Sequence, residues 1–316
     1  GLSGVKITRS GVASGSGARI IRIAPASGVR LPPAPDQRVA ENGRYGVLPK
    51  IGADGLRPLD AYARPFVSSA AVADGAPKIA LVVGGLGLNA QITTEAIERL
   101  PEDVTLAFAP YGATLERLAA LARARGHETL LQAPMEPFDY PQNNPGPHTL
   151  LTGAADGGAD DLHWLMSRFS GYAGVMNYLG GRYAADEAAL SGTLAEIAQR
   201  GLFFLDDGAA AQSLVGSLAP RLALPHARAD VALDARASAQ ALDAALAQLE
   251  VTARDRGAAI GFVNATPATI ARLARFAHDL EQRGVALAPV SAIVAARDAR
   301  SADTLVDAHT KGTRHK

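Results

Sequence analysis

An alternation of short apolar runs with longer amphipathic runs constrains the fold of this chain most strongly. Short apolar segments that alternate with helices are typical of a parallel sheet covered by helices. The strand-like runs are residues 79–83, 104–109, 128–133, 173–178, 202–206, 230–233, 258–263 and 285–290. We therefore expect strands to begin near the start of each run.

The runs between them have apolar residues at i, i+3, i+4 and i+7, and several end with basic residues and a glycine, as helices do. A first helix is expected from about Ala90, and the clearest others are residues 113–126, 159–170, 186–201, 238–257 and 267–284. Seven or eight strand–helix units in about 220 residues favour a closed barrel over an open sheet. The sequence thus predicts an α/β fold, an irregular (β/α) barrel of seven or eight parallel strands.

Composition divides the chain into three parts. Residues 1–75 are rich in Gly, Ser, Ala and Pro, which predicts an extended or flexible N-terminal arm with one edge strand at RIIRIAP. Residues 76–298 form the predicted barrel domain, and residues 299–316 a flexible polar tail.

Charge and composition exclude several partners. The 316 residues include 31 basic and 31 acidic ones, so nucleic acid is not an expected partner. Cysteine is absent, which excludes disulfides and thiolate nucleophiles. No apolar run reaches the roughly 18 residues that span a membrane. The chain begins at Gly1 rather than Met, so we expect a removed export signal or anchor.

The candidate site follows the strand-like runs, because ligands of α/β proteins bind at the carboxyl ends of strands. The groups there are amides, a phenol, an arginine and carboxylates. The predicted cleft residues are Gly84, Gly85, Gln132, Glu136, Asn177, Tyr178, Arg182, Asp206 and Asn264, and the weak catalytic candidates are Glu136, Asp206 and Asp207. Structural roles remain open for these residues: an ion pair of Arg182 with Asp206 or Glu136, strand-end caps at Asn177 and Asn264, and core packing of Tyr178.

Two cofactor hypotheses can be weighed from the same residues. A catalytic metal needs about three ligands, and no His-x-x-His or His-x-x-x-His pair exists, so no metal is expected. His148 is the histidine best placed to reach the strand ends, since it follows NNPGP in a loop. GLGLNA (85–90) fits a dinucleotide turn, but the second strand-like run ends in Pro110 and Tyr111, without the acid that holds a ribose.

Five segments in order resemble the divergent polysaccharide deacetylase family, a bacterial branch of the metal-dependent carbohydrate deacetylases. They are KIALVVGGLGLN, LLQAPMEPFDYPQNNPGPHTLL, GVMNYLGGRYAAD, GLFFLDDGA and GVALAPVSAIV, spread over about 220 residues. The resemblance implies an irregular (β/α) barrel, a cell-envelope glycan as ligand, and a periplasmic or exported protein with an anchor or signal upstream. An envelope protein is a further partner that this setting allows.

The departures from that family fall on its hydrolytic residues. Gly84 and Gly85 stand where the resemblance implies a pair of aspartates, and Tyr178 and Phe262 stand where it implies histidines. Metal-assisted deacetylation needs an activated water and a base. We therefore expect an emptied site in a protein that still binds glycan. The alternatives are an active deacetylase whose zinc or other divalent ion is held by relocated ligands (Glu136, His148, Asp206, Asp207), a structural protein, and a nucleotide-binding protein.

Overall fold

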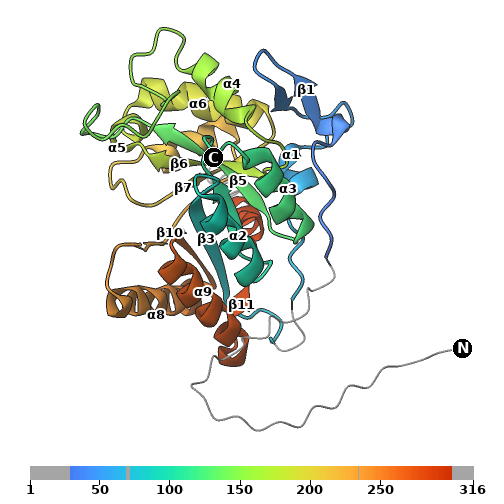
Figure 1. Ribbon diagram of the computed structural model, residues 1–316, viewed down its shortest axis with the longest axis vertical. Coiled ribbons are helices and arrows are strands. Elements are labelled where there is room, and N and C mark those ends of the chain that lie inside the picture. Colours follow the sequence, from blue (N-terminus) through green and yellow to red (C-terminus); the bar gives the residue numbers. More distant parts are fainter. Residues whose placement is uncertain (1–28, 69–71, 234, 301–316) are drawn as a thin grey trace, which may run out of the picture.

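The main sheet confirms the predicted architecture. The structure is a computed structural model that describes residues 29–68, 72–233 and 235–300. In this part of the chain nine strands, paired in parallel throughout, curl into an irregular barrel in the order β8-β7-β6-β5-β4-β3-β10-β9, with β11 beside the start of β3 (Figure 1). Eight of the strands coincide with the apolar runs: β3 (Lys78–Leu86), β4 (Thr105–Phe108), β5 (Thr129–Met135), β6 (Gly174–Leu179), β7 (Phe203–Asp206), β9 (Val231–Ala232), β10 (Ala258–Asn264) and β11 (Ala286–Leu287).

One extended segment joins the two ends of this sheet. It begins with β8 (His226–Arg228), which pairs with β7, and continues into β9, which pairs with β10. Between them, the Ala229 N–H donates to the Asp206 carbonyl (2.9 Å), and the Asp230 N–H donates to the Ile260 carbonyl (2.8 Å). Ala229 and Asp230 are consecutive residues, yet one bonds to β7 and the other to β10. Because these strands lie near opposite ends of the sheet, the segment joins the two ends and the sheet forms an irregular barrel. The sequence did not predict β8, whose three residues include a histidine and an arginine.

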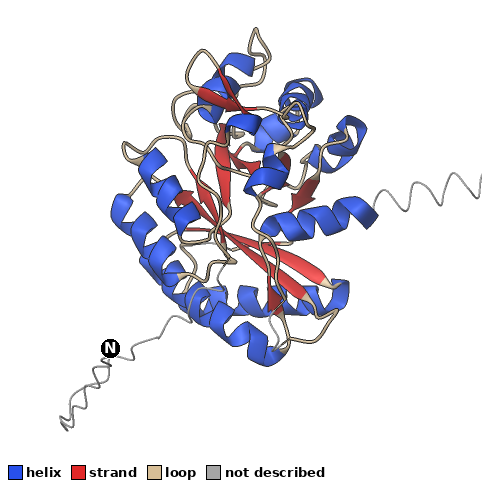
Figure 2. Cartoon of the chain, turned by 90° about the vertical axis from the view of Figure 1, so that its right-hand side faces the viewer, coloured by secondary structure: helices blue, strands red, loops and turns tan. Residues whose placement is uncertain are grey.

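Helices cover the outside of the barrel (Figure 2). They are α2 (Ala90–Arg99), α3 (Leu115–Ala124), α4 (Ala159–Met166), α5 (Gly181–Ala184), α6 (Glu187–Gln199), α7 (Val215–Leu218), α8 (Ala239–Arg256) and α9 (Pro267–Leu280), with 3-10 turns at Ala219–Leu222 and Glu281–Arg283 and a further helix over 290–300. Strand residues alternate between two apolar clusters, as the pleat requires. In β3, Ile79 and Leu81 pack toward the helices, whereas Ala80 and Val82 pack in the barrel interior.

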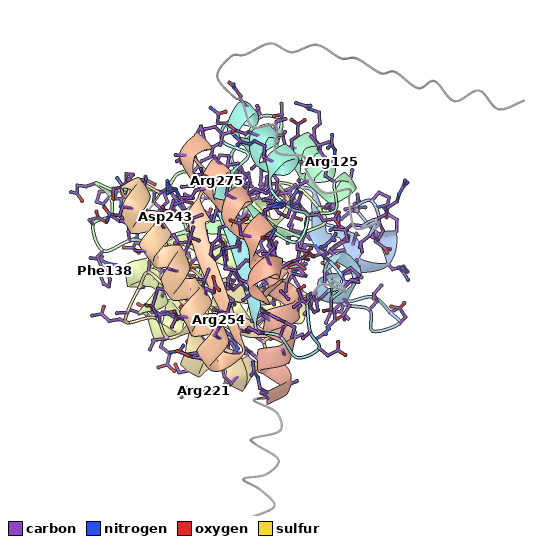
Figure 3. The ribbon with its side chains drawn as sticks, turned by 90° about the horizontal axis from the view of Figure 1, so that it is seen from below. Arg125, Phe138, Arg221, Asp243, Arg254 and Arg275 are labelled. Carbon is purple, nitrogen blue, oxygen red and sulfur yellow. The ribbon has the colours of Figure 1, made fainter. Side chains whose placement is uncertain are left out.

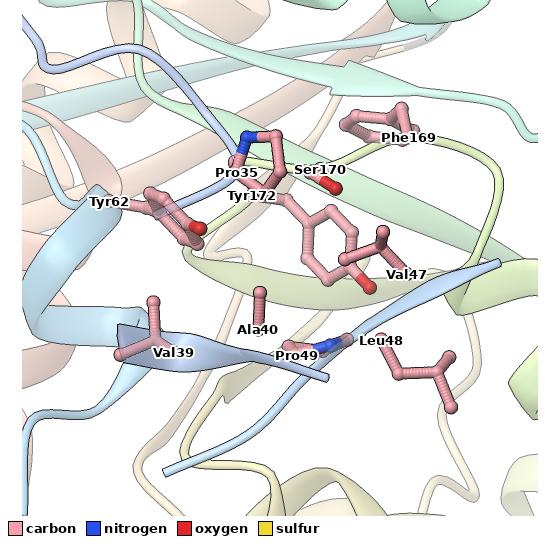
Figure 4. Close-up of a pocket in the computed structure, with 11 residues that line it drawn as sticks. Pro35, Val39, Ala40, Val47, Leu48, Pro49, Tyr62, Phe169, Ser170 and Tyr172 are labelled. Carbon is pink, nitrogen blue, oxygen red and sulfur yellow. The ribbon is translucent and has the colours of Figure 1, made fainter. Parts of the chain in front are cut away.

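Part of the expected N-terminal arm is packed against the barrel. Residues in this part form a 3-10 turn (Gln37–Val39), the hairpin of β1 (Ala40–Asn42) and β2 (Val47–Pro49), and α1 (Pro58–Tyr62). Figure 4 shows the hairpin facing Tyr172. The void between them has a volume of only about 10 Å³. The expected edge strand RIIRIAP and most of the expected tail lie outside the described residues. The difference from an extended arm arises because a few apolar residues, among them Val39, Leu48 and Tyr62, bury their side chains without any sequence periodicity.

A buried carboxylate ties this segment to the bottom of the barrel. Glu128 precedes β5 and is fully buried. It accepts hydrogen bonds from the Arg64 N–H (3.0 Å), the Thr105 hydroxyl (3.3 Å), and both the N–H (3.1 Å) and the hydroxyl of Ser291. One side chain thus joins the N-terminal segment, β4, β5 and the C-terminal helix.

Replacing Glu128 with glutamine should therefore destabilise the whole domain. The new side chain would turn an N–H₂ group toward backbone N–H donors, and each unsatisfied buried donor costs about 1–3 kcal/mol. We expect E128Q to lower the free energy of unfolding by at least about 2 kcal/mol in urea titrations. The control is E98Q on the exposed face of α2, expected within about 0.5 kcal/mol of wild type. Equal stability of both variants would contradict this role for Glu128.

Candidate functional site

The glycine turn after β3 lies at the carboxyl end of the central strand. The ladder to β4 shifts register between Val83 and Leu86, and Gly85 and Gly87 have φ values of 71° and 89°. The Gly85 N–H donates to Gln132 Oε1 (2.6 Å), and the Gly87 N–H donates to Thr93 Oγ1 (2.9 Å). A dinucleotide site uses such amides to bind a pyrophosphate. Because this turn uses them internally, its geometry argues against the nucleotide alternative.

Four of the predicted cleft residues meet at this turn. Gly84 is the register partner of Asn264 in β10, and the Gln132 side chain reaches from β5 past β4 to Gly85. A Cβ atom on Gly84 would lie 2.7 Å from both Gln132 Nε2 and Phe262 Cε2. The sequence suggested that glycine leaves an open space here. At Gly84 that space is instead filled by an amide and an aromatic ring.

Two buried polar atoms at this place have no hydrogen-bond partner among the described residues. They are Gln132 Nε2 and Asn264 Oδ1, and Asn264 Oδ1 lies 3.5 Å from the Cβ position of Gly85. Unpartnered buried polar atoms are rare and costly, and a functional role is one explanation for them. The mouth of the barrel therefore keeps one free donor and one free acceptor, both neutral.

Substitution of Gly84 should test this packing. A methyl group at Gly84 overlaps Gln132 and Phe262, so G84A should lower the free energy of unfolding by about 1–3 kcal/mol. The matched control is Gly192, inside α6 with open space around its Cβ position. G192A should instead raise stability by about 0.5–1 kcal/mol, because alanine favours helix. Thermal unfolding of the two variants measures both effects, and a neutral G84A would show that the site is open.

Asn177, Asp206 and Asp207 bond mainly to the backbone at the ends of β6 and β7. Asn177 Oδ1 accepts from the Asp207 N–H (2.9 Å), and its Nδ2 donates to the Leu179 carbonyl (2.8 Å). Asp206 and Asp207 accept from the Gly208 N–H (2.8 Å) and the Ala209 N–H (2.9 Å). These are strand-end and turn contacts, the structural role left open for Asn177. Burial, and more weakly the Asp206 charge, raise the pKa of the Asp207 carboxyl.

The raised pKa of Asp207 gives a pH dependence of stability with a defined sign. A folded-state pKa above the unfolded value of 3.8 means that this contribution is fully present below pH 3.8 and is lost as pH rises through the folded value. An asparagine side chain does not ionise, so D207N should gain stability relative to wild type as pH rises from 3.8. Urea unfolding at about pH 4 and about pH 7 measures this difference, with D74N on the exposed surface as control. If the free energy of unfolding of D207N minus that of wild type falls or stays constant between these two pH values, the assignment is wrong.

Glu136 and Arg182 hold loops together beside the mouth. Glu136 Oε2 accepts from both the N–H and the hydroxyl of Thr152 (2.7 Å each), and the Glu136 carbonyl accepts from the N–H groups of Arg182 (3.2 Å) and Tyr183 (3.1 Å). Arg182 Nη1 lies 3.3 Å from Glu136 Oε1, so the open question of its partner is answered: Glu136, not Asp206. Tyr178 is half-buried at the end of β6, beside Pro134 of β5.

His148 lies in a different arrangement, away from these carboxylates. Its Nδ1 is 2.7 Å from Asp161 Oδ1, and its ring stacks on Trp164. Asp161 and Trp164 were not among the site residues predicted from the sequence. Their i, i+3 spacing on one predicted helix was the available signal, since such residues share a helix face.

The residues present do not fit a catalytic metal. No group of three His, Asp or Glu side chains close enough to hold an ion occurs within residues 29–68, 72–233 and 235–300. At the strand end where a ligand pair would stand, Gly84 and Gly85 offer no donor side chain, and the space at Gly84 is filled.

The fold and the strand-end turn define an irregular parallel (β/α) barrel with a neutral, amide-lined mouth. Comparison with family models matches residues 81–294 to the divergent polysaccharide deacetylase family. The chain belongs to that family, as the five ordered segments predicted.

Two solved structures are similar to this chain. A crystal structure of the uncharacterized protein ATU2773 from Agrobacterium tumefaciens C58 is 45% identical, with a TM-score of 0.75 over 78% of this chain and 99% of that one. Protein EF3048 from Enterococcus faecalis V583 is 12% identical, with a TM-score of 0.49 over 69% of this chain and 99% of that one, too low to support an argument. A search of curated proteins found no match.

Proposed function

We propose that this protein binds a glycan of the cell envelope and does not hydrolyse it by the metal-dependent route. The family assignment supports a carbohydrate ligand. The observation that carries the proposal is the packing at Gly84, where Gln132 and Phe262 occupy the space of the side chain that would ligate a metal. Deacetylation needs a metal-activated water and a general base, and at the positions where the resemblance implies these groups the chain has Gly84, Gly85, Tyr178 and Phe262, none of them a carboxylate or an imidazole.

Sugar recognition needs only the groups that the barrel retains. Gln132 Nε2 and Asn264 Oδ1 lack a partner among the described residues but are buried, so a neutral hydroxyl or acetamido group would reach them only after the side chains around them move. The loop after β5 adds Phe138, which is 58% exposed and lies at the periphery in Figure 3. An apolar ring beside polar groups suits the mixed surface of a sugar.

The proposed setting is the periplasm or another exported location, with attachment to the membrane through an upstream segment. Within the described residues no helix combines the length and apolar character that a membrane crossing requires. Net charge of zero is compatible with an uncharged glycan as partner.

The active-deacetylase alternative has less support. Its relocated ligands would be Glu136, His148, Asp206 and Asp207. Glu136 is engaged by Thr152 and Arg182, and His148 by Asp161. Those contacts hold the candidate ligands in separate places.

Metal analysis and activity measurements on the purified chain test the proposal. We expect less than stoichiometric zinc, no acetate release from acetylated chitooligosaccharides, and measurable binding of the same oligosaccharides. The quadruple variant Gly84→Asp, Gly85→Asp, Tyr178→His and Phe262→His should gain metal affinity, because it adds four ligating side chains and replaces the phenyl ring of Phe262, which helps to fill the site, with a smaller imidazole. Stoichiometric metal together with acetate release by wild type would establish the alternative.

A further inference from the structure

A polar cleft lies outside the strand-end site, between the loop after β5 and the first turn of α4. Its volume is about 410 Å³, within the range of small-molecule sites. The polar groups that line it come from Tyr140, Asn144, His148, Thr149 and Asp161. The proposed function has so far used none of these residues.

His148 is held in a fixed orientation at this cleft. Asp161 Oδ1 lies 2.7 Å from Nδ1, and the ring stacks on Trp164 with 3.9 Å between centroids and 18° between planes. The guanidinium of Arg168 lies 4.6 Å from the Trp164 ring centroid, so Trp164 itself is restrained. The backbone of His148 has a φ of 58°, an unusual value for a residue other than glycine. Backbone strain of this kind clusters at ligand sites.

The wall of the cleft is also preformed. The Tyr111 hydroxyl donates to the Pro147 carbonyl (2.7 Å), and the Thr149 hydroxyl donates to the Gly146 carbonyl (2.6 Å). Gly146 has a φ of 134°, and a Cβ there would lie 2.7 Å from Cζ of Tyr111, so the loop packs closely on that ring. Because the wall is ordered before a ligand binds, the entropic cost of binding is lower.

The polar groups that line the cleft indicate which class of ligand it can bind. With Nδ1 bonded to Asp161, Nε2 is the ring atom of His148 that remains for a ligand, and the structure shows no partner for it in the described part of the chain. The phenol, amide, imidazole and carboxylate combine donors with acceptors, whereas no lysine or arginine lines the cleft. Anionic ligands would meet Asp161 without a counter-charge, and a single carboxylate with one imidazole is too few ligands for a divalent ion.

We propose that this cleft binds a neutral sugar unit, with His148 as its central hydrogen-bonding residue and Asp161 as the residue that positions the imidazole. This inference rests on the proposed function, because it names where that glycan is held. The strand-end mouth and the cleft are then two binding places of one protein, and the cleft is the one with a preformed wall.

Binding measurements on the full chain test the cleft. The probes are tetra-N-acetylchitotetraose and cellotetraose, titrated by calorimetry into wild type, H148Q and D161N. Loss of one oriented hydrogen bond should weaken binding of the preferred probe by about tenfold in each variant. In wild type, the imidazole ¹⁵N resonances of His148 should shift on titration, which a merely structural histidine would not show.

The matched control is His163, on the same helix as Asp161. Both histidines are about one-third exposed (33% for His148 and 34% for His163), and His163 Nε2 lies 2.6 Å from Glu196 Oε1. H163Q removes a comparable hydrogen-bonded histidine–carboxylate contact outside the cleft, so it should leave affinity unchanged, and thermal unfolding confirms that all variants fold. If wild type, H148Q and D161N bind the probe with equal affinity, the cleft is not the binding site, but the proposed glycan binding is still supported. No binding of either probe by wild type would overturn both.

Discussion

The hydrogen bonding of residues 225–233 is the constraint on which the rest of the barrel depends. A parallel sheet that stops at an edge leaves a row of unpaired backbone groups. Here Ala229 bonds to β7 and Asp230 to β10. The Asp230 carboxylate reinforces the change of partner, since Oδ2 accepts from the Ile260 N–H (2.8 Å) and lies 2.6 Å from Arg297 Nη2. With both ends of the sheet held, the carboxyl ends of β3, β5 and β10 converge, and Gly84, Gln132 and Phe262 come into contact.

Glycine is needed at position 84 and at position 85 for two different physical reasons. Gly85 has a positive φ and gives its N–H to Gln132, so it serves the turn. Gly84 is in the strand and leaves room for side chains that come from β5 and β10. The mouth is therefore a packed neutral surface rather than a hollow. A carbohydrate ligand at this end of the barrel would meet hydrogen-bonding groups without a charge to activate water.

The sequence predicted the barrel well and the site less well. Apolar strands and amphipathic helices carry local periodic signals, and all eight predicted strands occur in one parallel sheet. The strands β8 (HAR) and β1 (AEN) were missed because most of their residues are polar, and β2 (VLP) was missed because its short apolar stretch ends in proline. The division into an arm, a barrel domain and a tail stays a prediction.

Side-chain contacts between residues far apart in the sequence explain why the site was predicted less well than the barrel. The partners of Glu128 include Ser291, 163 positions away, and the filling of the Gly84 space depends on Phe262. No local pattern records such pairs. The order of the motifs correctly predicted that Gly84, Gln132 and Asn264 lie close together. It could not predict that the Gln132 and Phe262 side chains fill the space beside Gly84.

The filled space at Gly84 also limits how this sequence can change. A carboxylate introduced there by one substitution would overlap Gln132 and Phe262 before it could reach any ion. The side chains at positions 132 and 262 both lie 2.7 Å from the Cβ position of Gly84, so they must make room first, and only afterwards does an acid at position 84 fit. The order of substitutions on a path from this chain to a metal-binding protein therefore matters. An acid at position 84 is tolerated only after its neighbours have changed, and it destabilises the fold if it comes first.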